Sequence, residues 1–180
     1  MKVTQLDLEG LIEWETNSYS DERGFLYERY NKDLLQALRV SFTQQNVSVS
    51  KKSAIRGLHW QKSPHDQGKL VTCMYGEIYD VAVDIRKSSP TFGKHLAVQL
   101  SGRKGNSLWI PSGFAHGFQA LTEEVVVTYS VTSDFAPSAA SACHPLDPEI
   151  AIKWPLPNPI LSLKDSTADL LNQLSTEELF

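Results

Sequence analysis

The chain has few of the features that mark disulfide-bonded, nucleic-acid-binding or membrane proteins. Its two cysteines, Cys73 and Cys143, form no CxxC pair and are too few for a disulfide framework. Cys73 lies in an apolar run and is expected to be a small buried hydrophobic residue. The net charge of -4 lacks the basic excess of a phosphate-binding surface. The absence of a signal peptide and of an apolar run of about 20 residues favours a soluble cytoplasmic protein.

Length and strand patterning predict a single β-rich domain over residues 1–180. A chain of this length, 41% hydrophobic and 21% charged, buries roughly 70% of its unfolded surface. The β-rich runs 69–75 and 77–86 flank Gly76 and predict a hairpin. Further strands are expected, separated by turns, at 92–100, 107–110, 114–121 and 125–132. Many short strands without alternating helices favour an antiparallel sandwich or barrel.

Helix is scarce in the pattern. Residues 31–38 predict a short helix with Asn31 as N-cap, and residues 167–174 predict another, capped by Ser166 or Thr167. The segment 145–159 holds five prolines and is expected to wrap around the body in an extended form. The alternating segment 2–11 fits an edge strand that seeks a partner.

The segment Arg56-Gly57-Leu58-His59, followed by Lys69, places a guanidinium, an imidazole and an ammonium near one another. Together these groups suit chemistry on an anionic substrate that carries a carbonyl. Arg56 and His59 are three residues apart, so a regular strand would aim them at opposite faces. A bulge at Gly57 would bring them together. Taken alone, a histidine such as His59 is more often a structural residue near a strand end.

A second histidine lies in a pattern of the type G-x5-P-x-G-x2-H, formed by Gly105, Pro111, Gly113 and His116. This pattern resembles the second motif of cupins, which are jelly-roll barrels with their function in the interior. The Pro-Gly turn would aim the imidazole into the lumen. Metal-binding cupins supply an H-x-H pair and a nearby Glu, whereas His59 is followed by Trp and Gln. The sequence therefore predicts a barrel without a metal site.

Taken together, the motifs resemble the dTDP-4-dehydrorhamnose 3,5-epimerase family over roughly residues 3–170. Eight segments in the order typical of that family carry the resemblance: 21–25 with Glu28, 44–48, 56–59, 69–71, 80–86, 89–93, 113–118 and 162–165. The resemblance implies a cupin-type jelly-roll β-barrel with a few short peripheral helices. It also implies a homodimer whose N-terminal strands pack across the interface.

The implied reaction inverts C3 and C5 of a dTDP-linked 4-keto-6-deoxyhexose, as in the dTDP-L-rhamnose route. Both carbons are α to the C4 carbonyl, so a base, an acid on the opposite face and a donor near O4 suffice. No cofactor is expected, in keeping with the absence of a GxGxxG turn and a P-loop. By resemblance, His59 is the base and Asp165 its carboxylate partner. Tyr129 is the acid, and Lys69, assisted by His116, stabilises the enolate.

The resemblance also assigns substrate contacts. The residues expected to contact the nucleotide sugar are Arg23, Glu28, Gln44, Gln45, Asn46, Arg56 and Lys164. Phe135 stands in place of a tyrosine that stacks on thymine, and a phenyl ring can still stack. Ala140 stands where the family has a Glu, which removes an acceptor for the nucleotide sugar.

Several alternatives remain open from the residues themselves. Tyr129 shares a face with Val127 and Val131, so it could be a core residue. Lys69 and Asp80 could form a buried ion pair, and Asp84 with Arg86 suggests a structural pair. At the level of function, the alternatives are an epimerase acting at C3 only, a non-catalytic sugar-binding cupin and a metal-dependent cupin dioxygenase.

Overall fold

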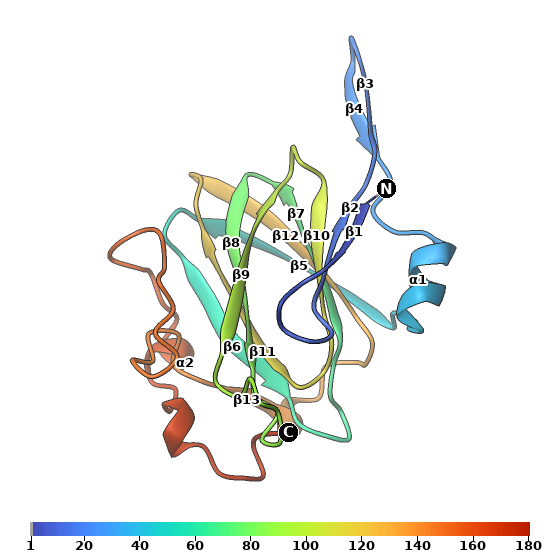
Figure 1. Ribbon diagram of the computed structural model, residues 1–180. Helices are drawn as coiled ribbons and strands as arrows, with labels where there is room; N and C mark the ends of the chain where they lie inside the picture. The colour runs from blue at the N-terminus through green and yellow to red at the C-terminus, as the bar shows by residue number, and fades with distance from the viewer. Residues whose placement is uncertain (1) are drawn as a thin grey trace.

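Two antiparallel β-sheets stacked face to face form the body of the protein (Figure 1). The computed structural model describes residues 2–180. One sheet has six strands, in the order β1 (Lys2–Gln5), β2 (Ile12–Glu15), β10 (Asn106–Ile110), β7 (Lys69–Tyr75), β12 (Glu124–Val131) and β5 (Gln44–Lys51). The other has five, in the order β13 (Ala140–Ala142), β6 (Ile55–Gln61), β11 (Phe114–Ala120), β8 (Glu77–Asp84) and β9 (His95–Ser101). The predicted jelly-roll barrel is confirmed.

The main core fills the space between the sheets because strand side chains alternate between two faces. Val71 and Cys73 of β7 meet Ile78 and Ala82 of β8 there, together with Phe118 of β11. Cys73 is fully buried, as predicted for a small hydrophobic residue.

The predicted hairpin of residues 69–75 and 77–86 is wrong. β7 pairs with β10 and β12, whereas β8 pairs with β9 and β11, so the two strands belong to different sheets. Gly76, with a φ of +75°, turns the chain from one sheet to the other. Crossing over places the apolar residues of β7 and β8 on facing sheets, where both are buried. A hairpin would have left them side by side in one sheet.

The outer face of the five-stranded sheet is buried as well. Val81 and Val83 pack there against Ile150 and Leu171 from the C-terminal part of the chain. The proline-rich segment 145–159 runs over this face without helix or strand, as its prolines predict. Both faces of β8 are therefore covered, and Asp80, one of its three charged residues, is fully buried beside His116.

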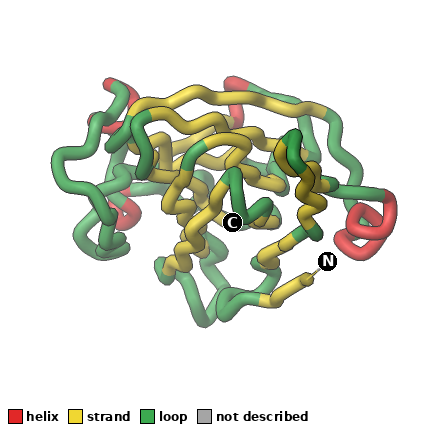
Figure 2. Tube along the Cα trace, turned by 90° about the horizontal axis from the view of Figure 1, so that it is seen from above, coloured by secondary structure: helices red, strands yellow, loops and turns green. Residues whose placement is uncertain are grey.

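The first predicted helix is confirmed as α1 (Lys32–Leu38), with Asn31 Oδ1 accepting from the Leu34 amide. Leu34 packs with Trp14, Leu70 and Trp109 on the outer face of the six-stranded sheet. Seen from above, the helices lie at the periphery of the stacked sheets (Figure 2).

The helix predicted at 167–174 is wrong. The chain instead forms α2 (Leu163–Ser166), capped by Ser162, and a 3-10 turn at Leu171–Gln173. The reason is tertiary: the Leu171 amide donates to Asp147 Oδ2, and the Asp169 carbonyl accepts from the His144 amide. A continuous helix would require those backbone groups for its own hydrogen bonds.

The N-terminal part forms two further features. The predicted edge strand is present as β1, at the end of the six-stranded sheet. A separate hairpin of β3 (Ser18–Asp21) and β4 (Gly24–Tyr27) projects away from the barrel (Figure 1). Its side chains Tyr19, Phe25 and Leu26 are exposed.

Candidate active site

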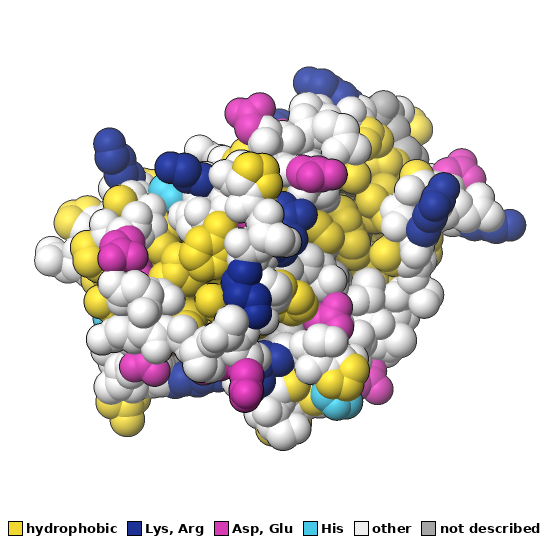
Figure 3. All heavy atoms as spheres, turned by 60° about the horizontal axis from the view of Figure 1, so that its bottom comes forward, with side chains coloured by type: hydrophobic (Ala, Val, Ile, Leu, Met, Phe, Trp, Pro, Cys, Tyr) yellow, Lys and Arg dark blue, Asp and Glu magenta, His cyan; other side chains and the backbone are white. Residues whose placement is uncertain are grey.

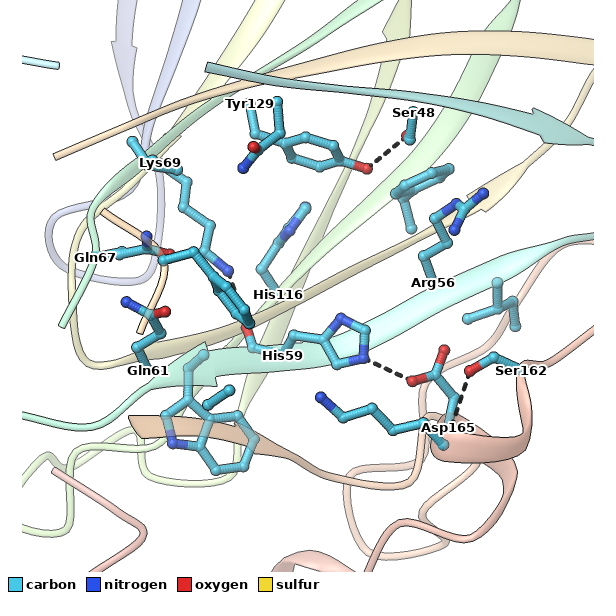
Figure 4. Close-up of a pocket in the computed structure, with 18 of the residues that line it drawn as sticks. Ser48, Arg56, His59, Gln61, Gln67, Lys69, His116, Tyr129, Ser162 and Asp165 are labelled. Atoms are coloured by element: carbon cyan, nitrogen blue, oxygen red, sulfur yellow. Dashed lines mark hydrogen bonds and ion pairs between the residues drawn. The ribbon is translucent and has the colours of Figure 1, made fainter. Parts of the chain in front are cut away.

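A cavity of about 580 Å³ opens between the two sheets, and residues of the segment 160–165 contribute to its lining. This size suits a small-molecule ligand. Figure 4 shows polar side chains converging on it from both sheets. On the face seen in Figure 3, Lys and Arg side chains gather along the middle beside hydrophobic surface. Cavity residues Arg56, Lys69 and Lys164 supply positive charge suited to an anionic ligand.

A β-bulge brings Arg56 and His59 to the same cavity. On β11 the partners of Arg56 and His59 are Phe118 and His116, so three steps on β6 oppose two on β11. Gly57 has a φ of +137°, and a Cβ there would lie 2.4 Å from the Gly117 Cα. Only glycine allows this close approach of two backbones. The predicted bulge is confirmed, and both side chains line the cavity.

His59 is held by a carboxylate from the far end of the chain. Its Nε2 lies 2.6 Å from Asp165 Oδ1. Burial acts to raise the pKa of Asp165, but the hydrogen bond and charge of His59 lower it below its usual value. The short helix α2 positions this carboxylate, with Ser162 Oγ accepting from the Asp165 amide. The pair can hold one imidazole orientation and stabilise an imidazolium.

Tyr129 enters the cavity from the opposite sheet. Its hydroxyl lies 2.9 Å from Ser48 Oγ on β5, and its ring packs against His116 and Phe118. Burial raises the pKa of Tyr129 well above its ordinary value. The ring contacts satisfy the expectation of a core residue, while the hydroxyl points into the cavity (Figure 4). His59 and Tyr129 thus stand on facing walls of one cavity.

Lys69 and His116 form the floor between these walls. Lys69 Nζ donates to the His59 carbonyl at 3.1 Å, and burial lowers the pKa of Lys69 to about 8. The fully buried Asp80 accepts from His116 Nε2 at 2.7 Å, so its close partner is His116 rather than the lysine. Burial raises the pKa of Asp80, opposed by His116 and Lys69. The Lys69 side chain and the His116 ring, next to one carboxylate, are hydrogen-bonding groups that suit a developing enolate.

The predicted substrate contacts divide into two groups. Asn46, Arg56, His116, Phe135 and Lys164 line the cavity together with the four predicted catalytic residues. Four others lie outside that lining: Arg23, Glu28, Gln44 and Gln45.

Each of these four has its own surroundings. Arg23 pairs with Asp21 on the projecting hairpin. Glu28 directly follows the hairpin and accepts a hydrogen bond from Asn31. Gln44 lies at the rim, where it accepts from the Phe135 amide. Gln45 binds Ser130, a neighbour of Tyr129 on the opposite face of β12, and so points away from the cavity.

Sequence reasoning missed several residues of the site. Gln61 donates to the Asp134 carbonyl and accepts from the Ala136 amide, and Gln67 donates to the Ser133 carbonyl. These side chains fix the loop that carries Phe135, a contact that no local pattern could reveal. Ser48 could have been found, because it shares the inward face of β5 with Asn46.

A further prediction concerns the pair formed by Asp84 and Arg86. Asp84 accepts from two guanidinium nitrogens of Arg86, which confirms a structural pair away from the cavity.

Across residues 2–180, no cluster of three or more His, Cys, Asp or Glu side chains could hold a metal ion. No helix in the same range is long and apolar enough to cross a membrane.

Comparison with known proteins identifies the family. The profile described as dTDP-4-dehydrorhamnose 3,5-epimerase matches residues 5–173, nearly the whole chain. The chain belongs to the dTDP-4-dehydrorhamnose 3,5-epimerase family. The epimerase of that name from Salmonella typhimurium is 45% identical over 177 residues, which cover 96% of this chain and 97% of the relative.

Solved structures of family members share the fold. The dTDP-6-deoxy-D-glucose-3,5-epimerase of Legionella pneumophila, solved with dTDP-4-keto-L-rhamnose, is 43% identical, with a TM-score of 0.94. The match covers 99% of this chain and 96% of that protein. A more distant relative, the dTDP-4-dehydrorhamnose 3-epimerase of Streptomyces niveus, is 35% identical over 95% of this chain and 84% of its own length. The family therefore includes enzymes named for one and for two epimerisations.

Proposed function

We propose that this epimerase converts dTDP-4-dehydro-6-deoxy-D-glucose to dTDP-4-dehydro-L-rhamnose by inverting C3 and C5, in the dTDP-L-rhamnose route. The observation that carries the proposal is the placement of His59 and Tyr129 on facing walls of one cavity. Inversion requires a proton to leave one face of the sugar ring and return to the other. Greater identity to relatives named 3,5-epimerase than to the 3-epimerase favours both carbons over C3 alone.

In the proposed mechanism His59, oriented by Asp165, removes the proton from the carbon next to the C4 carbonyl. The electron pair of that C–H bond moves toward O4, where Lys69 and His116 stabilise the enolate. Tyr129 then donates its proton to the opposite face of the carbon. Before the second cycle, His59 loses its proton to water and Tyr129 takes one up from water, and the same two steps at the other α carbon then complete the reaction. Hydrogen leaves and returns as a proton, so the chemistry calls for no redox cofactor.

The nucleotide end is proposed to lie at the rim near Phe135. Phe135 is 58% exposed and free to stack, and Gln44 and Gln61 hold its loop by hydrogen bonds to the Phe135 and Ala136 amides. Such a fixed aromatic surface reduces the entropy lost on binding. Arg56 and Lys164 are the cations proposed for the diphosphate. The dTDP-sugar in the Legionella protein supports this class of ligand.

Deuterium exchange tests the function directly. The purified protein is incubated with dTDP-4-keto-6-deoxyglucose in deuterated water, and C3 and C5 are followed by NMR. Exchange with inversion at both carbons supports the proposal, whereas exchange at C3 alone identifies a C3 epimerase. Absence of exchange contradicts both and favours a non-catalytic binding protein. His59→Ala should abolish exchange while dTDP binding remains measurable by calorimetry.

A homodimer is proposed in which the β3–β4 hairpin of one chain completes the cavity of the other. The hairpin exposes Phe25 and Leu26 and carries Arg23, and Glu28 lies just beyond it. Both predicted contacts lie outside their own cavity lining. Large exposed apolar side chains on a projecting hairpin fit burial against a second copy. A cytoplasmic location remains a prediction of the sequence.

Mixed dimers test this arrangement. Arg23→Ala and His59→Ala chains are co-expressed with different tags, and the mixed dimer is purified. If Arg23 acts in the partner's cavity, one site of each mixed dimer is intact and activity returns to about half of wild type. Activity no greater than that of the Arg23→Ala dimer would show that Arg23 acts only within its own chain.

A further inference from the structure

The strand β5 holds functional side chains from two other strands. Its inward-facing residues Ser48 and Ser50 alternate along the edge of the six-stranded sheet. Ser48 Oγ lies 2.9 Å from the Tyr129 hydroxyl, and Ser50 Oγ accepts from Arg56 Nε at 2.8 Å. Two serine hydroxyls on the same face of one strand thus contact Tyr129, the proposed acid, and Arg56, which is proposed to bind the diphosphate.

The Tyr129 hydroxyl is a better acid when a neighbour donates a hydrogen bond to its oxygen. Its own proton must point at the sugar carbon, so its oxygen can only accept from a neighbour. Among the described residues, the Ser48 hydroxyl lies within hydrogen-bond distance of that oxygen. A serine hydroxyl can donate one proton, and Ser48 is only half-buried, so solvent can satisfy its remaining acceptor capacity.

We infer that Ser48 is a positioning residue for the acid, donating a hydrogen bond to Tyr129 before and after proton transfer. The inference rests on the proposed function. In the step, the Tyr129 O–H bond breaks, a C–H bond forms at the sugar, and the electron pair stays on the phenolate oxygen. The Ser48 proton stays on Ser48 and stabilises that phenolate.

The electrostatics of the pocket agree with this role. Burial raises the pKa of Tyr129, while the Ser48 hydrogen bond and the charge of Arg56 lower it. Hydrogen bonds to an ionised partner are stronger than neutral ones, so the contribution of Ser48 grows as the phenolate forms. An interaction that strengthens during the reaction accelerates the step rather than merely tightening binding.

The test measures how the enolate divides between return to substrate and conversion to inverted product. In deuterated water an enolate reprotonated by His59 gives exchanged substrate without inversion, and one protonated by Tyr129 gives inverted product. Ser48→Ala should slow inversion about tenfold to a hundredfold. Exchange into recovered substrate should continue, so the ratio of exchange to inversion rises by a similar factor. Ser48→Thr, which restores the hydroxyl, should return the ratio to within about threefold of wild type.

Ser50→Ala is the matched control on the same strand and face. Because Ser50 holds Arg56, this change should raise KM while the ratio of exchange to inversion stays as in wild type. If Ser48→Ala does not fold, Ser48→Cys provides a weak donor and should still raise the ratio. An unchanged ratio in the folded Ser48 variant overturns the inference. Wild-type protein that shows no exchange at all overturns the proposed function instead.

Discussion

Replacing Asp165 by Asn should slow proton abstraction without weakening nucleotide binding. The carboxylate contacts His59 Nε2 at 2.6 Å, and its side chain is only 3% exposed. A hydrogen bond to a charged partner contributes about 1.5–3 kcal/mol, and each 1.36 kcal/mol is tenfold in rate. That range corresponds to roughly 10- to 150-fold. Because the His59 side chain is 37% exposed, water compensates part of the loss, and we expect about 10- to 50-fold.

The assay follows deuterium entry at C3 and C5 by NMR alongside kcat. The rate of deuterium entry and kcat should fall together, because Asp165 supports proton abstraction, which precedes protonation by Tyr129. The dissociation constant of dTDP should change less than threefold. Glu123→Gln removes an exposed carboxylate paired with Lys52 and serves as control, with no expected change in rate. If Asp165→Asn exchanges both protons at more than half the wild-type rate, the carboxylate does not support the base.

Three further predictions follow from the structure. Burial lowers the pKa of Lys69 to about 8, so a rate that needs the ammonium should fall about tenfold per pH unit above 8. Lys69→Arg should move this decline to higher pH, and a wild-type kcat/KM profile that is flat to pH 10 would contradict the role. Phe135→Ala should weaken dTDP binding by about 5- to 150-fold in calorimetry, since stacking on a base contributes about 1–3 kcal/mol. Phe135→Tyr is the control and should bind within threefold of wild type. Gly57→Ala should cost about 2–6 kcal/mol of unfolding free energy, because strain and backbone overlap add. Gly24→Ala has a similar φ of +132° but open space around it, so denaturant unfolding should show the smaller loss there.

In the proposed dimer, the projecting hairpin would carry two predicted contacts, which lie outside the cavity of their own chain, to the cavity of the partner. Arg23 and Glu28 were assigned by family position, which carries no information on the subunit that uses them. In the structure both are exposed and paired with near neighbours in sequence, Asp21 and Asn31. Such local pairs on the surface contribute little energy and can be exchanged readily for a substrate.

The sequence by itself determined the features that depend on neighbours along the chain. The alternation of apolar and polar residues predicted most strands. Asn31 predicted the start of the first helix, and the glycine between Arg56 and His59 predicted the bulge. The family motifs supplied the predicted catalytic residues. Local pattern failed where long-range contacts decide the outcome. The local pattern predicted a hairpin of β7 and β8, but each strand pairs with strands of a different sheet. It also predicted a helix at 167–174, where the Leu171 amide instead donates to Asp147.

Only the tertiary structure decided which side chains meet. Asp165 reaches His59 across 106 residues, and Ser48 reaches Tyr129 across 81. No spacing rule connects positions so far apart, because their distance is set by how two sheets stack and where the C-terminal segment folds back. The depressed pKa of Lys69 also arises from this enclosure, since burial in the assembled barrel, rather than any sequence neighbour, removes water from its ammonium.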